Sequence, residues 1–160
     1  PQLAQTGIGQ FEVAATPLQM AMVAAGIGNG GVVMKPFIVD ELRTPSLQVL
    51  DKTEPEQWGR AVSSRTAREL TDLLVSTVDN GTASPAAIPG VGGAGETGTA
   101  QSGIDGVAPY AWFVSFAPAN DPEVAVAVMI QSADIDRGEV AGGRLGGPIA
   151  KVVMEAVISR

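Results

Sequence analysis

The sequence predicts an α+β fold in which helices pack on an antiparallel β-sheet. Three segments carry helix start signals or helical spacing of apolar residues, and two consecutive runs in the second half alternate as strands do. A tight connection between these two runs favours antiparallel pairing. With 160 residues, 45% of them hydrophobic and 17% charged, the chain is long enough to form one domain with its own core.

The N-terminal part is expected to contain one buried helix. The first fifteen residues predict an irregular or extended lead-in. A helix follows, because Thr16, Pro17 and Gln19 supply an N-cap, a proline at the first helical position and the partner of a capping box. It is expected to run to about Ile27 and to be buried, because its residues are apolar on nearly every side.

A β-hairpin and a second helix are predicted next. Residues 32–42 and 47–50 form the two strands, joined through a turn at 44–46, and residues 51–62 are expected to be polar and irregular. The helix should start at a capping box and end at a glycine, with a loop after it. The capping box is Thr66 with Glu69, the helix ends at Asn80-Gly81, and the loop spans 81–93. The apolar residues at helical spacing are Ala67, Leu70, Leu73, Leu74 and Val78.

The C-terminal half predicts two strands and a last helix. Tyr110–Ala117 and Glu123–Gln131 alternate as paired antiparallel strands do, with the tight connection between them. The glycines that follow are expected to form a loop, after which Pro148 opens the helix. These glycines lie at 138, 142, 143, 146 and 147, and the predicted apolar face of the helix is Ile149, Val152, Val153, Ala156 and Val157.

Composition excludes several kinds of chemistry. A net charge of −7 argues against nucleic acid as a partner, because phosphate binding needs clustered lysine and arginine. The chain has no cysteine, which excludes disulfides and thiolate catalysis, and no histidine, which removes the usual general base and the commonest metal ligand. No metal or cofactor is expected. No apolar run reaches the length of a membrane span, and because the chain starts at Pro1 we expect a processed or excised piece.

The stretch Gly95-Glu96-Thr97-Gly98-Thr99-Ala100 is the candidate functional surface. It follows a glycine-rich approach at 89–94 and precedes the two predicted strands. We expect an edge strand whose open backbone faces a groove, since unpaired N–H and C=O groups suit an extended peptide.

Residues 90–97 also match a phosphate-binding loop, except that Glu96 stands where that pattern has lysine. A glutamate would repel the phosphates, and residues 97–103 form a poor helix start where the pattern requires a helix. A nucleotide site is therefore disfavoured.

Two pairs of acidic side chains and two aromatic side chains could also contribute to a functional site. Two pairs of acids lie in predicted turns and are expected to be solvated: Asp134 with Asp136, and Asp121 with Glu123. Tyr110 and Trp112 either line a groove or belong to the core.

A series of short motifs runs in order along the whole chain. They are Gly9-Gln10, Thr16–Ala21, Asn29–Gly31, Lys35-Pro36, Asn80–Ala83, Gly95–Gln101, Ala111–Phe113 and Phe116–Pro118. This series resembles the C-terminal half of a class B penicillin-binding protein transpeptidase domain. The resemblance implies part of a penicillin-binding or serine β-lactamase-like fold, with residues 1–160 as the C-terminal portion of a single transpeptidase domain.

The resemblance assigns roles to the third motif of the family and shows what is missing. No serine is followed three residues later by lysine, and no Ser-x-Asn occurs, so the nucleophile and its base would lie in the preceding half. The third motif, Lys-Thr-Gly in the family, reads Glu96-Thr97-Gly98. By resemblance, Thr97, Gly98 and Thr99 bind substrate, and the Thr99 backbone N–H helps to form the oxyanion hole. Glu96 stands at the lysine position and cannot supply its positive charge.

The resemblance implies a D,D-transpeptidase that cross-links peptidoglycan stem peptides and binds β-lactams on the extracytoplasmic face of the cell membrane. The full-length protein would be membrane-anchored, with no anchor in this chain, and the chain alone would be inactive. Its expected partners are the nucleophile-bearing N-terminal half or another copy of the chain, the stem peptide and β-lactams. Two alternatives stay open: a non-catalytic binding or scaffolding variant, which Glu96 favours, and a proteolytic fragment that needs its other half.

Overall fold

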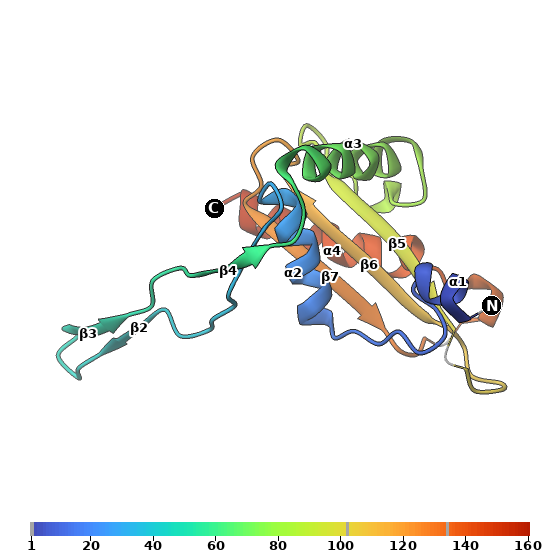
Figure 1. Cartoon of the computed structure of the whole chain (residues 1–160), viewed down its shortest axis with the longest axis horizontal. Helices are drawn as coiled ribbons and strands as arrows, with labels where there is room; N and C mark the ends of the chain where they lie inside the picture. The colour runs from blue at the N-terminus through green and yellow to red at the C-terminus, as the bar shows by residue number, and fades with distance from the viewer. Residues whose placement is uncertain (1, 102, 134) are drawn as a thin grey trace.

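A three-stranded antiparallel sheet forms the centre of the computed structural model, which describes residues 2–101, 103–133 and 135–160. Its strands follow one another in the order β5, β6 and β7 (Figure 1). They span Ala94–Ala100, Tyr110–Ala117 and Val124–Ile130. The predicted antiparallel pair is confirmed, and so is the placement of the Gly/Thr-rich stretch on an edge strand.

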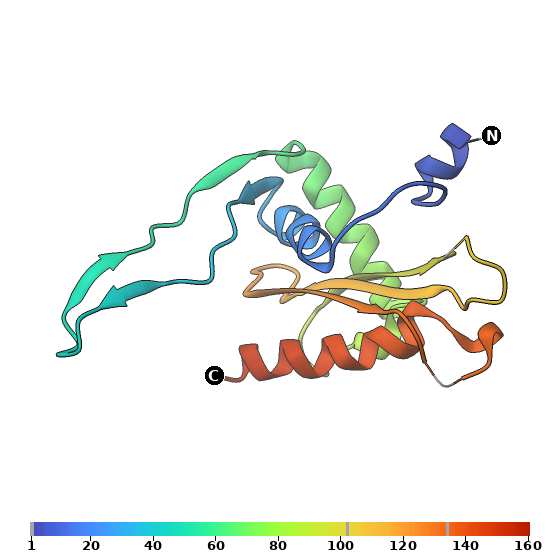
Figure 2. The ribbon, with the colours of Figure 1, turned by 90° about the horizontal axis from the view of Figure 1, so that it is seen from below.

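Helices cover both faces of this sheet, which confirms the α+β class. Helices α2 (Pro17–Gly28) and α3 (Ser64–Asn80) lie on one face and α4 (Gly142–Ile158) on the other (Figure 2). One core cluster includes Phe113 and Met154, and a second is centred on Phe116. The two phenylalanines sit on opposite faces because side chains alternate along β6. Among the described helices, none combines the length and hydropathy that a membrane crossing requires.

The N-terminal segment departs from the predicted irregular lead-in. Gln2–Gly7 forms a short helix, α1, whose Gln, Leu and Ala residues favour helix. Helix α2 begins as predicted, since the Thr16 side chain accepts from the Gln19 N–H at 3.2 Å and the Gln19 Oε1 accepts from the Thr16 N–H at 2.8 Å.

The prediction that α2 is buried is wrong for this chain. Only Ala24 and Gly26 are buried, whereas Leu18 and Val23 are 57% and 50% exposed. The sheet covers one side of the helix, and the described residues leave these two side chains uncovered.

The predicted hairpin is correct at its tip and wrong at its base. Strands β2 (Glu41–Arg43) and β3 (Val49–Lys52) pair around the turn, in an arm that extends away from the body (Figure 1). Residues 32–42 do not form one strand, because Pro36 lacks an N–H for the ladder. The polar stretch instead contains β4 (Gln57–Arg60), which pairs with β1 (Val32–Met34).

Helix α3 starts one turn earlier than predicted. Its N-cap is Ser63 rather than Thr66, and the Ser63 hydroxyl accepts from the Thr66 N–H at 3.1 Å. Glu69 pairs instead with Arg65, one turn away, at 2.8 Å. The predicted end at Asn80-Gly81 is confirmed, and the loop after it contains a short 3₁₀ turn, η1 (Ser84–Ala86).

Helix α4 starts at Gly142, so the predicted loop over its glycines and the start at Pro148 are wrong. A Cβ on Gly142 would lie 1.9 Å from the Trp112 carbonyl oxygen, and one on Gly146 would lie 2.6 Å from the Phe113 Cβ. The glycines therefore let the helix approach the sheet closely.

The buried face of α4 differs from the predicted one for the same reason. It consists of Gly142, Gly143, Gly146, Gly147, Ala150 and Met154. Ile149, Val152 and Val153, from the predicted face, are exposed.

Candidate functional site

The predicted site residues Glu96, Thr97, Gly98 and Thr99 all lie on β5, at the open edge of the described sheet. The Thr99 carbonyl oxygen accepts from the Gln10 side chain and the Thr97 N–H donates to the Glu96 carboxylate, and neither partner lies on β6. Alternate residues of an antiparallel strand direct their backbone groups to opposite sides. The backbone of Thr97 and Thr99 therefore faces the open edge, while Glu96 and Gly98 face β6.

A pair of hydroxyl groups lies beside this edge. The Thr97 Oγ1 is 3.1 Å from the Thr82 Oγ1, and either atom can donate. Thr82 lies two residues after the end of α3, in the Asn80–Ala83 motif. The site prediction missed Thr82, although the motif that contains it was a usable signal. Two adjacent hydroxyls can donate to an anionic group such as a carboxylate.

The Glu96 carboxylate folds back against the next residue of its own strand. Its Oε1 accepts from the Thr97 N–H at 2.8 Å and lies 3.4 Å from the Thr97 hydroxyl. Across the described ranges, none of the ion pairs includes Glu96. An uncompensated negative charge therefore stands beside the hydroxyl pair and occupies one backbone donor of the open edge.

Packing fixes β5 at its edge and on one face of the sheet. At the edge, to which the Gly95 backbone points as those of Thr97 and Thr99 do, the Thr77 hydroxyl of α3 bonds the Gly95 carbonyl oxygen. On the face that α4 covers, a Cβ on Gly142 would lie 2.8 Å from the backbone N and O of Gly98. These contacts leave little room for β5 to shift, so its open edge is held in place.

A hollow of about 240 Å³ lies next to the site strand. Its lining combines Gly98, Thr99 and Trp112 with residues of the N-terminal segment, among them Ile8 and Gln10. Trp112 is half-buried, so the groove interpretation of this residue is confirmed. Tyr110 is half-buried on β6 and does not line this hollow.

Gln10 is the second residue that the site prediction missed. Its Nε2 donates to the Thr99 carbonyl oxygen at 3.1 Å, and its Oε1 accepts from the Gln101 N–H at 3.3 Å. The Gly9-Gln10 motif is visible in the sequence, but no local pattern connects Gln10 with Thr99, which is 89 residues away.

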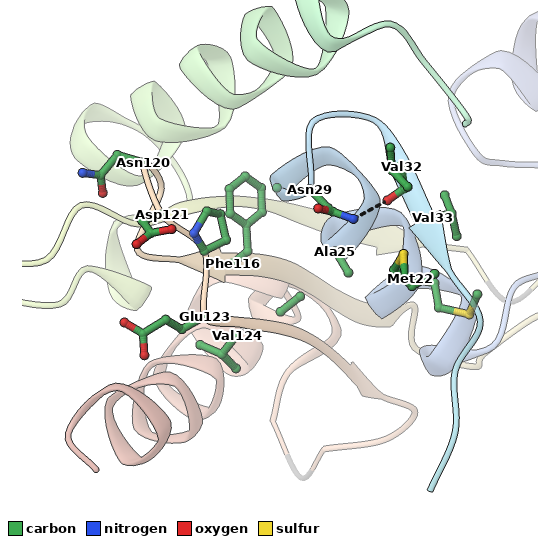
Figure 3. Close-up of a pocket in the computed structure, with 14 residues that line it drawn as sticks. Met22, Ala25, Asn29, Val32, Val33, Phe116, Asn120, Asp121, Glu123 and Val124 are labelled. Carbon is green, nitrogen blue, oxygen red and sulfur yellow. Dashed lines mark hydrogen bonds between the residues drawn. The ribbon is translucent and has the colours of Figure 1, made fainter. Parts of the chain in front are cut away.

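A larger hollow of about 540 Å³ lies at the other end of the sheet (Figure 3). It is lined by residues such as Met22, Phe116 and Val124 and by none of the predicted substrate-binding residues. Val124 pairs with Ala117 and Thr99 with Ala111, a separation of roughly 20 Å along β6 at about 3.3 Å per residue.

The acidic residues of the two predicted turns do not form a functional site in the described part of the chain. Asp121 and Glu123 lie on the rim of the larger hollow and are exposed, as expected for loop acids (Figure 3). Asp136 is exposed, and Asp134 lies outside the described residues. In the part of the chain that the structure describes, no group of three potential ligands could hold a metal ion. Residues 90–97 run into β5 rather than a helix, which argues against the nucleotide site.

Comparison with known proteins gives consistent matches over the whole chain. Residues 2–155 match the family described as the penicillin-binding protein transpeptidase domain. The peptidoglycan D,D-transpeptidase PbpA of Mycolicibacterium smegmatis is 45% identical over 158 residues, which cover 98% of this chain and 32% of that protein. The stage V sporulation protein D of Bacillus subtilis is 32% identical over 157 residues, covering 94% of this chain and 24% of that protein.

Solved structures of Mycobacterium tuberculosis PBPA agree with these matches. The crystal structure of PBPA has a TM-score of 0.89 at 44% identity and covers 98% of this chain and 37% of that chain. A ceftriaxone acyl-enzyme complex of the same protein has a TM-score of 0.90 at 42% identity, covering 98% and 35%. The chain thus spans about a third of the length of its PbpA relatives. From the fold and these matches, the chain belongs to the penicillin-binding protein transpeptidase domain family.

Proposed function

We propose that this chain is the C-terminal portion of a serine D,D-transpeptidase domain, which cross-links peptidoglycan stem peptides and is acylated by β-lactams. The observation that carries the proposal is the open edge of β5 in a member of this family, where Thr97 lies on the strand and Gly98 and Thr99 line a groove. Acyl-enzyme complexes of the M. tuberculosis homologue with ceftriaxone, imipenem and penicillin G support the β-lactam part of the proposal.

In this proposal the β5 edge binds the peptide and stabilises the charge that develops during acylation. A serine outside the 160 residues gives its proton to a base and attacks the carbonyl carbon of the D-alanyl-D-alanine bond, which forms a tetrahedral intermediate. Collapse of this intermediate breaks the C–N bond, releases the terminal D-alanine with the proton on its amine, and leaves an acyl-enzyme. The Thr99 N–H donates to the oxyanion of the tetrahedral intermediate. The Thr97 hydroxyl, with Thr82 at 3.1 Å, donates to the terminal carboxylate of the peptide. An amine of a neighbouring stem then accepts the acyl group.

The proposal divides the catalytic machinery between this chain and a companion. The 160 residues contain no Ser-x-x-Lys and no Ser-x-Asn, so the nucleophile and its base come from the N-terminal half of the same domain, and this chain alone is inactive. A second copy of the chain is the other candidate companion. Exposed apolar side chains on α2 and α4, such as Leu18 and Val152, support the need for further cover.

The proposed substrate also sets the proposed location. Peptidoglycan stem peptides are cross-linked outside the cytoplasmic membrane, so we place the complete protein on its extracytoplasmic face with an anchor outside this chain.

Glu96 favours a second candidate function, a non-catalytic binding or scaffolding variant. Two unit charges about 4 Å apart interact by roughly 4 kcal/mol at an effective dielectric of about 20. Replacing an attractive lysine with a glutamate therefore disfavours binding of an anionic substrate terminus by an energy on the order of several kcal/mol. The Glu96 carboxylate lies next to the Thr97 hydroxyl and N–H, which supports a direct effect on carboxylate binding.

A labelling experiment separates the two candidates. The natural polypeptide that contains these 160 residues is incubated with a fluorescent penicillin, and the adduct is located by peptide mapping. The transpeptidase proposal expects a covalent adduct on a serine outside the 160 residues and none on the isolated chain. An unlabelled natural polypeptide would favour the scaffolding variant, and a labelled isolated chain would contradict the division of the machinery.

A further inference from the structure

The side-chain amide of Gln10 bonds the edge of β5 as a peptide group of an additional strand would. Its Nε2 donates to the Thr99 carbonyl oxygen at 3.1 Å, and its Oε1 accepts from the Gln101 N–H at 3.3 Å. Both ends of the amide are thereby used, each in its correct polarity. The two backbone groups flank Ala100, the last residue of β5.

The backbone around Gln10 is itself held in place by a turn. A turn after α1 brings the backbone N–H of Gln10 to the Gln5 carbonyl oxygen at 2.9 Å. Gly9 adopts a φ of 73°, which glycine accepts without strain, so this turn carries no backbone strain at that position. Gln10 is half-buried, whereas residues 2–9 are exposed.

The contact falls where the site strand would otherwise be free to fray. Beyond Ala100 the chain enters a loop in which Gly103 and Gly106 have positive φ and the described residues through 107 are exposed. Strand ends next to exposed loops open most readily. An oxyanion donor must stay within about 2.7–3.1 Å of its acceptor, so a small tilt of the Thr99 peptide would weaken it.

We propose that Gln10 is a positioning residue that keeps the Thr99 N–H directed at the oxyanion. The N–H and C=O of one residue in an antiparallel strand point to the same side. By holding the Thr99 C=O and the Gln101 N–H together, the Gln10 amide sets the direction of the Thr99 N–H without touching the substrate. This inference rests on the proposed function of Thr99.

Three substitutions in the natural polypeptide that contains this chain test the role of Gln10. Gln10→Ala removes both hydrogen bonds. Gln10→Asn is one methylene shorter and does not reach the strand. Gln10→Glu keeps an acceptor for the Gln101 N–H but turns a carboxylate oxygen toward the Thr99 carbonyl oxygen. Gln5→Ala is the matched control, an exposed glutamine of α1 whose backbone oxygen, not its side chain, takes part in the turn.

The readouts are the limiting acylation rate with penicillin G, its apparent dissociation constant, the melting temperature and amide hydrogen exchange at Gln101. We expect all three Gln10 variants to lower the limiting acylation rate by about tenfold while the melting temperature stays close to that of the unmutated protein. Exchange at Gln101 should accelerate in Gln10→Ala and Gln10→Asn and stay slow in Gln10→Glu. Gln5→Ala should match the unmutated protein in every readout.

The possible failures are distinguishable. An unmutated protein that penicillin does not acylate would overturn the proposed function, and the role of Gln10 with it. An acylated unmutated protein together with a Gln10→Ala variant of equal acylation rate would overturn the role of Gln10 alone. If Gln10→Ala does not fold, the nearly isosteric Gln10→Glu decides: a limiting rate equal to that of the unmutated protein contradicts the inference.

Discussion

The hydroxyl oxygens of Thr82 and Thr97 lie 3.1 Å apart and connect the loop after α3 to the open edge of β5. The two threonines are 15 residues apart in the sequence and belong to two different motifs. Their hydroxyl pair forms the polar end of the proposed substrate site, because two adjacent hydroxyls can donate to one carboxylate. The Glu96 carboxylate, 3.4 Å from the Thr97 hydroxyl, competes for the same donors.

Removing the Thr97 hydroxyl should weaken carboxylate binding. Thr97→Val keeps a β-branched side chain on the strand, and a hydrogen bond to a charged group contributes roughly 1.5–3 kcal/mol. We expect the second-order rate of acylation by penicillin G to fall by at least about tenfold in the natural polypeptide. Thr71→Val is the control, since the Thr71 hydroxyl donates to the Ala67 carbonyl oxygen within α3, at 2.9 Å. Equal loss in both variants would assign the effect to stability.

Reversing the charge at Glu96 should increase acylation. Glu96→Lys restores the family lysine and removes the acceptor beside the Thr97 N–H, so we expect a gain of at least about tenfold, or 1.4 kcal/mol. The acylation rate with penicillin G is measured in the natural polypeptide. Glu123→Lys makes the same charge change on the exposed rim of the distant hollow and should leave the rate unchanged. Equal rates for Glu96→Lys and the unmutated protein would show that this charge does not limit the reaction.

The close approach of α4 to the sheet predicts a stability effect. A Cβ on Gly146 would lie 2.6 Å from the Phe113 Cβ, so Gly146→Ala should lower the free energy of unfolding by about 1–3 kcal/mol. Gly138→Ala is the matched control, because nothing lies within 4 Å of its added Cβ. Urea denaturation of the natural polypeptide measures both. A Gly146→Ala variant as stable as the control would contradict the packing described for α4.

The isolated 160-residue chain should associate and should not react with β-lactams. Leu18 and Val23 on α2, and Val152 on α4, are at least half exposed, and the chain carries no Ser-x-x-Lys nucleophile. Sedimentation should show oligomers or aggregates rather than a single monomeric species. A monodisperse monomer that unfolds cooperatively in calorimetry would contradict this prediction.

The sequence predicted those features of the fold that local signals encode. The capping box at Thr16 and Gln19, the antiparallel strands β6 and β7 and the edge strand β5 all depend on neighbouring residues, and all were confirmed. The start of α3 was misplaced because Ser63 and Thr66 are both plausible caps three residues apart, and Ser63 is the one that caps the helix.

The errors arose where long-range packing decides the structure. The glycines of α4 resemble a loop in the sequence, and only the neighbouring carbonyl of Trp112 explains why the helix needs Gly142 there. Strand β4 was missed because its partner β1 is more than twenty residues away in the sequence. The contact between Gln10 and Thr99 was missed for the same reason, although both residues belong to motifs visible in the sequence.

The central claim, that the Thr99 backbone N–H at the open edge of β5 is an oxyanion donor, is tested most directly by Thr99→Pro. Proline removes that N–H and is tolerated on an edge strand whose N–H points away from its neighbour. Thr99→Ala keeps the N–H and loses the hydroxyl.

The measurement is the limiting acylation rate with penicillin G in the natural polypeptide, with the melting temperature as a check on folding. Loss of one oxyanion donor typically lowers the rate by roughly 10²–10³. We expect a loss of that size in Thr99→Pro and at most about a tenfold loss in Thr99→Ala. A folded Thr99→Pro variant that is acylated as fast as Thr99→Ala would contradict the claim.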